Sequence, residues 1–114
     1  MESILNSIKV DLGYEPEDTG FDEPIMDEIN AVFMSLTQMG VGPSDGFLIE
    51  DETAVWDDFI PSDQKKKFGA VKSYTHKKVK LAFDSASMSS ALISAYERQI
   101  AEIEWRLTHA AESE

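Results

Sequence analysis

Residues 21–49 read FDEPIMDEINAVFMSLTQMGVGPSDGFLI and contain a helix with recognisable signals at both ends. Asp22 is a good N-cap, because its carboxylate can accept a hydrogen bond from the free N–H groups of the first turn. Pro24 suits that turn, since it has no N–H to leave unpaired. Gly40 is the expected left-handed residue after the last turn, and Val41 can close a Schellman motif.

The body of this helix carries an apolar stripe. Its members recur at spacings of three and four residues: Ile25, Ile29, Val32, Leu36 and Met39. This spacing is typical of a helix that packs on one face, so we predict a helix over residues 23–39. Gly42-Pro43 and Asp45-Gly46 then turn the chain twice, before the short apolar run of residues 47–49.

Two more stripes of the same kind follow. Residues 64–83 carry one of them, with Gly69 inside, and we expect close helix packing there because glycine costs about 1 kcal/mol relative to alanine. Residues 88–108 carry Leu92, Tyr96, Ile100, Ile103 and Leu107 at spacings of three and four. The sequence therefore predicts two long amphipathic helices.

The remaining segments complete an all-α prediction. A short helix is expected over residues 3–12, a short hairpin or extended loop near 47–56, and a helical turn between Trp56 and Phe59. At 114 residues the chain is long enough for one domain. We predict a small bundle of three to four helices, with a flexible tail over residues 109–114.

Charge is distributed unevenly along the chain. The net charge is −12, and residues 1–63 hold sixteen acids and one base, whereas residues 64–83 hold seven lysines and no acid. One interpretation is a solvated surface. The other is self-complementarity, in which the basic helix of one copy meets the acidic surface of the next.

Trp105 lies about opposite the stripe of the last helix, at ~100° per residue. A tryptophan there needs a second partner. Another part of the same domain, such as the first helix, could cover it. Alternatively it contacts a neighbouring subunit, since tryptophan is a preferred interface anchor.

The chain lacks any recognisable catalytic, metal or cofactor motif. It has no cysteine, and His76 and His109 fall on different predicted helices. No phosphate-binding loop, calcium loop or nucleophile elbow is present, so we expect no enzyme, metal or cofactor. No apolar run approaches the ~20 residues that span a bilayer. The net charge of the chain would repel DNA from the predicted helix of residues 64–83, which we call the lysine helix.

A family resemblance rests on an ordered set of phrases. They are LTQMGVGP at 36–43, GFLI at 46–49, WDDF at 56–59, KVKLAFD at 78–84 and IEWRL at 103–107. Together they resemble small head–tail connector (adaptor) proteins of long-tailed bacteriophages and prophages. Ser85-Ala86 stand where that family would place prolines, which leaves the geometry of this corner open.

The resemblance implies an α-helical structural protein of the virion neck, made in the host cytoplasm. Such proteins form a ring, typically dodecameric, beneath the portal. The C-terminal part would dock to the portal, and the other side would meet a stopper or tail-completion protein. DNA would pass through the lumen without being read, and an acidic wall would not retain its phosphates.

From these observations we expect the lysine helix to meet acids of a neighbour's 15–28 or 50–58 segment, and Trp105 with the following tail to reach the portal. The candidate interface residues are Lys65, Lys66, Lys72, Lys77, Lys78, Phe47, Ile49, Trp105, Arg106 and His109. The rival hypothesis is an acidic DNA mimic that inhibits a DNA-binding protein. The lysine block argues against it, because a mimic needs unbroken negative charge.

Overall fold

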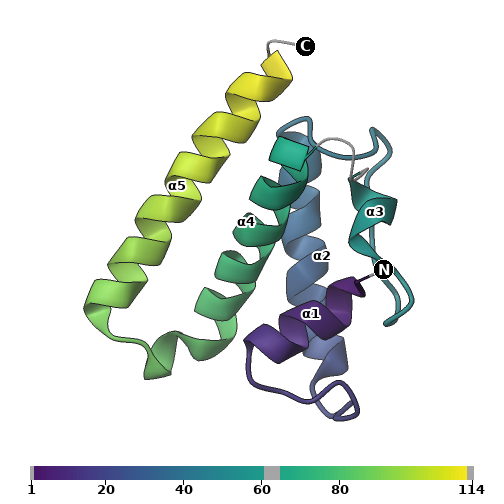
Figure 1. Cartoon of the computed structure of the whole chain (residues 1–114), viewed down its shortest axis with the longest axis vertical. Helices are drawn as coiled ribbons and strands as arrows, with labels where there is room; N and C mark the ends of the chain where they lie inside the picture. Colours follow the sequence, from purple (N-terminus) through teal and green to yellow (C-terminus); the bar gives the residue numbers. More distant parts are fainter. Residues whose placement is uncertain (1, 61–64, 113–114) are drawn as a thin grey trace.

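The computed structural model describes residues 2–60 and 65–112, which form helices joined by loops (Figure 1). The elements are α1 (Ile4–Asp11), α2 (Asp22–Gln38), the single turn α3 (Trp56–Phe59), α4 (Lys65–Asp84), the 3-10 turn η1 (Ser85–Ser87) and α5 (Ser90–Glu112). No β-strand occurs in these described ranges, and one isolated antiparallel bridge joins Ser3 to Val55. The predicted all-α bundle is confirmed.

Helix α4 lies at the centre of the arrangement. It packs against α2 and α1 on one side and against α5 on the other (Figure 1). Helix α5 returns antiparallel to α4 and makes its main contacts with α4 alone. The molecule is thus a compact group of α1, α2, α3 and α4, with α5 added as an outer layer.

The two ends of α2 differ in how well the sequence predicted them. Gly40 has φ +85°, the Gly40 N–H donates to Thr37 O at 3.0 Å, and the Val41 N–H donates to Leu36 O at 2.9 Å. These are the two bonds of the predicted Schellman motif. Asp22, in contrast, is the first helical residue and not the N-cap. Its carboxylate instead pairs with Lys9 Nζ at 2.7 Å, because a buried cation is available there.

The core gathers the apolar faces of α1, α2, α3 and α4. Phe33 of α2 stacks on Phe59 at 4.4 Å between ring centroids and meets Trp56 edge-on at 6.3 Å. Trp56 and Phe59 are both almost fully buried, as expected for a helical turn held by two aromatic anchors. The Val55 N–H donates to the Asp58 carboxylate at 3.0 Å, which caps the start of α3.

The 47–56 segment is an extended loop and not a hairpin. It runs between α2 and the N-terminus: the Asn30 side chain both accepts from Ile49 N (2.8 Å) and donates to Ile49 O (3.1 Å). Further along, the Ile4 N–H donates to Ala54 O at 3.0 Å. A side-chain amide and the chain terminus therefore take the place of a partner strand.

Two local expectations differ from the structure. Gly69 is exposed, and a methyl group added there would meet no described atom within 4 Å, so the close packing predicted for it is wrong. The helix expected to end at 108 continues to Glu112, and the last two residues of the predicted tail lie outside the described residues.

Candidate interaction surfaces

The lysine helix is partly neutralised within the chain. Lys72 Nζ lies 2.6 Å from a carboxylate oxygen of Glu2, and Lys80 Nζ donates to the Asp11 carbonyl at 3.3 Å. His76 Nδ1 lies 3.4 Å from the Asp11 carboxylate. One face of α4 therefore meets acids at the two ends of α1 in the same copy, Glu2 just before it and Asp11 at its end, so Lys72 is already paired before any neighbour arrives.

Two other lysines lie beside the seam between α4 and α5. Lys77 Nζ is 5.8 Å from the Tyr96 ring centroid and donates to Ser73 Oγ at 2.7 Å. Lys78 Nζ is 5.8 Å from the ring centroid of Tyr74. Both side chains are half-buried, and each places its ammonium group beside an aromatic ring instead of a carboxylate. The side chains of Lys65 and Lys66 lie outside the described residues.

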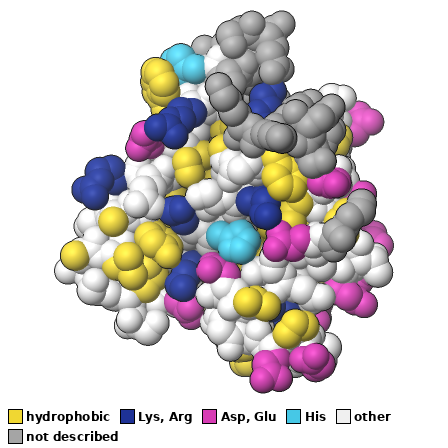
Figure 2. Space-filling model, in the orientation of Figure 1, with side chains coloured by type: hydrophobic (Ala, Val, Ile, Leu, Met, Phe, Trp, Pro, Cys, Tyr) yellow, Lys and Arg dark blue, Asp and Glu magenta, His cyan; other side chains and the backbone are white. Residues whose placement is uncertain are grey.

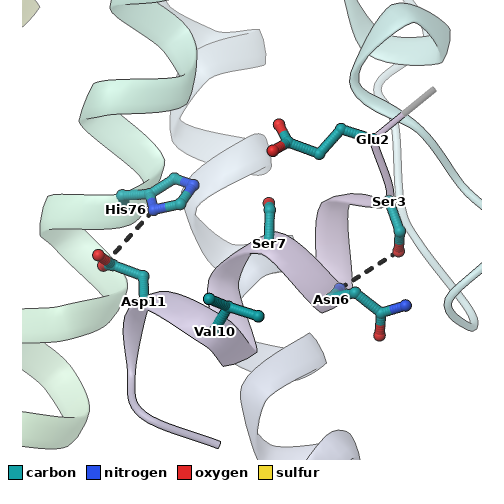
Figure 3. Close-up of a pocket in the computed structure, with 7 residues that line it drawn as sticks. All are labelled: Glu2, Ser3, Asn6, Ser7, Val10, Asp11 and His76. Atoms are coloured by element: carbon teal, nitrogen blue, oxygen red, sulfur yellow. Dashed lines mark hydrogen bonds and ion pairs between the residues drawn. The ribbon is translucent and has the colours of Figure 1, made fainter. Parts of the chain in front are cut away.

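A hollow of about 570 Å³ lies between α1 and α4 (Figure 3). It brings together Ser7, Asp11 and His76, the residue types of a hydrolytic triad. The Ser7 hydroxyl, however, donates to Ile4 O (3.0 Å) and accepts from Trp56 Nε1 (3.0 Å), so its proton is not directed at His76. This hydroxyl is therefore not set up as a nucleophile.

The same hollow shows how burial and charge compete at His76. Its ring stacks on Trp56, with 5.9 Å between the ring centroids. Burial lowers the pKa of His76 despite the opposing effect of the Asp11 carboxylate. The imidazole is thus favoured in its neutral form. Neither in this hollow nor anywhere else in the described ranges do three His, Asp or Glu side chains gather as a metal site.

A second hollow, of about 500 Å³, is formed by α2 and the 45–48 loop. Met34 and Leu48 line it and are 59% and 62% exposed. Phe47 is half-buried and packs on Phe33, with 5.8 Å between the ring centroids. Ile49 is 3% exposed, so its side chain faces the chain's own core and is not available to a partner. We call this hollow the α2 groove.

The far end of α5 presents a third surface. Trp105 is 62% exposed and stacks on His109 at 4.0 Å between ring centroids, and Arg106 pairs with Glu102 on the helix surface. The described chain therefore does not cover Trp105, which excludes the first of the two alternatives. An exposed tryptophan beside arginine is a typical interface anchor.

Sequence reasoning overlooked Lys9. This residue is 1% exposed, and its ammonium group binds both the Asp22 carboxylate (2.7 Å) and the Pro16 carbonyl (2.9 Å). It fixes the acidic 13–20 loop to the core. The available signal was its position as the lone base among the acids of residues 1–63.

On the face that Figure 2 draws, basic and acidic side chains gather over different parts of the molecule. Figure 2 shows hydrophobic side chains, with Lys and Arg beside them, over the α4–α5 hairpin, whereas most Asp and Glu lie over the opposite edge. Among the described residues, no helix is both long and apolar enough to cross a membrane.

Similarity to known proteins is found at the level of a family model. No curated protein matches the chain, and no solved structure does either. A family model described as phage connector protein matches residues 4–114, nearly the whole chain. That family is structural and not catalytic. Because this match covers nearly all of the sequence, the chain belongs to the phage connector protein family.

Proposed function

We propose that this connector forms a ring between the portal and the tail or stopper protein and extends the DNA channel at the capsid vertex. The supporting observation is the family match over residues 4–114, joined to large apolar side chains that one copy leaves exposed. Met34, Leu48 and Trp105 each expose more than half of their surface. Apolar groups on separate faces suit repeated contacts between identical subunits.

The portal contact is assigned to the end of α5. Trp105, Arg106 and His109 are exposed there, and Trp and Arg are the residues that most often anchor interfaces. The stopper or tail-completion protein then meets the opposite side of the ring. DNA passes through the lumen without sequence-specific contact, because an acidic surface does not hold phosphates.

Electron microscopy of the protein mixed with its portal protein tests this function. We expect a ring of the connector coaxial with the portal, and the variant Trp105→Ala should bind portal more weakly while its circular dichroism spectrum is unchanged. A connector that stays monomeric and ignores portal would contradict the proposal.

Reversal of charge on the lysine helix gives a second test. The variant Lys77→Glu/Lys78→Glu should lower ring assembly while leaving the fold intact, because both lysines are half-exposed. A pull-down with a portal protein and with a DNA-binding enzyme separates the connector from the DNA-mimic alternative, which the net charge of −12 favours. Capture of the enzyme alone would support the mimic.

A further inference from the structure

The first half of α5 carries an apolar stripe that its own chain does not finish covering. Ile100, at the middle of α5, and Leu107, further along, are 7% and 2% exposed, whereas Leu92 near the start is 41% exposed. Tyr96 is half-exposed, with the ammonium group of Lys77 5.8 Å from its ring centroid. The seam between α4 and α5 therefore ends in a corner that is both apolar and basic. We call Lys77, Leu92 and Tyr96 the α5 corner.

The α2 groove has the opposite charge. Asp27 lines its extension together with Met34 and Leu48, and Glu23 lies one helical turn before Asp27 on the same face. Both acids are exposed, and none of the described residues that line the groove is a base. This surface therefore runs from carboxylates at the start of α2 to exposed apolar side chains near its end.

We propose that the α2 groove of one copy receives the α5 corner of a second copy. Leu92 and Tyr96 would pack against Met34 and Leu48, and the Lys77 ammonium would meet Asp27. Along α2, Asp27 and Met34 are about 10 Å apart at 1.5 Å per residue. Tyr96, whose ring centroid lies 5.8 Å from Lys77 Nζ, and Leu92 are about 6 Å apart on α5 by the same rise. Each surface thus places a charged group within about 10 Å, along a helix, of an exposed apolar side chain.

The occupant is a second copy because the two surfaces complement each other and belong to one chain. They lie on different sides of α4, since α4 separates α2 from α5 (Figure 1). A contact between two different faces of identical subunits is heterologous, and it closes into a ring when the rotation permits. This inference rests on the ring proposed above and assigns its lateral contact, which leaves Trp105 to the portal.

Engineered disulfides test the contact directly, because the chain has no cysteine of its own. The double variant Met34→Cys/Leu92→Cys, assembled and mildly oxidised, should give a ladder of covalent oligomers on non-reducing gels. Met34→Cys/Val10→Cys is the matched control: Val10 is 61% exposed but lies on α1, and we expect no ladder. Rings that form without a ladder from the first variant would overturn the contact and leave the ring function intact.

A charge exchange provides the second arm. Lys77→Glu should weaken association of the copies roughly fivefold, because it replaces an attraction of about 0.5 kcal/mol with a similar repulsion. Adding Asp27→Lys should restore association, whereas Asp27→Lys alone should weaken it. Arg98→Glu is the control, since Arg98 is exposed on α5 but points about 200° around the helix from Tyr96. Equal loss from Lys77→Glu and Arg98→Glu without rescue would overturn the pairing, and the absence of rings under all conditions would overturn the proposed function.

Discussion

Helices α2 and α5 carry equally regular apolar stripes and yet are buried very differently. The residues of α2 that are at most 4% exposed are Ile25, Ile29, Val32, Phe33 and Leu36. In α5, only Ile100 and Leu107 of the predicted stripe reach comparable burial, and Leu92 remains 41% exposed. The reason is position: α2 packs against both α1 and α4, whereas α5 has α4 alone as its main neighbour.

The comparison shows what a stripe does and does not predict. Periodicity predicts that a face will be apolar, but it does not say which chain will cover that face. In α2 the cover comes from the same copy. In α5 the stripe is buried at Ile100 and Leu107, whereas Leu92, near the start of the helix, stays 41% exposed. Variants on the two helices should therefore separate effects on folding from effects on assembly.

The largest effect is expected at the α2 core. Phe33→Ala removes a ring that is fully buried and stacks on Phe59, so it should lower the free energy of unfolding by about 3–5 kcal/mol. Urea denaturation followed by circular dichroism would measure it. Met34→Ala, at the next position but 59% exposed, should change the unfolding free energy by less than about 0.5 kcal/mol. Similar losses from both variants would contradict the assigned burial.

A smaller loss of unfolding free energy is expected when the buried Lys9 is replaced. Lys9→Met keeps the apolar stem but leaves the Asp22 carboxylate and the Pro16 carbonyl without their donor, which should cost about 2 kcal/mol. Lys72→Met is the comparison, because its pair with Glu2 is exposed and should contribute well under about 1 kcal/mol. Equal unfolding free energies for the two variants would show that Lys9 does not hold the loop.

These examples also show where prediction from the sequence succeeds. The C-terminal end of α2 was predictable because Gly40 and Val41 form a local motif, complete within a few residues. The role of Asp22 was not, because its partner Lys9 lies in another helix and competes with the N-cap. Periodicity likewise placed Trp105 on the outer face of α5, but only the packing shows that nothing in the described chain covers it.

The lysine helix illustrates the same limit. Composition showed a basic segment in an acidic chain but not its internal partners. Lys72 meets Glu2, and Lys80 meets the Asp11 carbonyl 69 residues away in sequence. Such pairs depend on how α1 crosses α4. The candidate surfaces were therefore predictable as helices and charges, whereas the division between internal and external contacts required the structure.

A smaller change in the free energy of unfolding is expected at the hydrogen bond that joins Tyr74 of α4 to Glu104 of α5. Tyr74 is buried and its hydroxyl donates to Glu104 at 2.7 Å, so Tyr74→Phe should lower the free energy of unfolding by about 1–2 kcal/mol. Tyr96→Phe, on the open corner, should change it by less than about 0.5 kcal/mol. Denaturation at neutral pH would compare the two, and equal losses would contradict a specific role for Tyr74.

Tyr74 also gives a pH signature. Burial, together with the hydrogen bond to Glu104 and its charge, raises the pKa of Tyr74 above its usual value. Above about pH 10 the unfolded chain therefore loses this proton while the folded chain keeps it, and stability falls as pH rises. Tyr74→Phe lacks this contribution, so its difference from the wild type should shrink above pH 10.

The smallest effect on folding, and the one that separates α5 from α2, is expected at Leu92. Leu92→Ala removes a side chain that is 41% exposed, so the monomer should lose less than about 1 kcal/mol. Ring assembly should nevertheless fall, because the proposed lateral contact buries the rest of this side chain. Denaturation and sedimentation velocity on the same preparation would measure both quantities. A variant that loses several kcal/mol of stability would mean that the α5 corner is already covered within one copy, and the contrast with α2 would disappear.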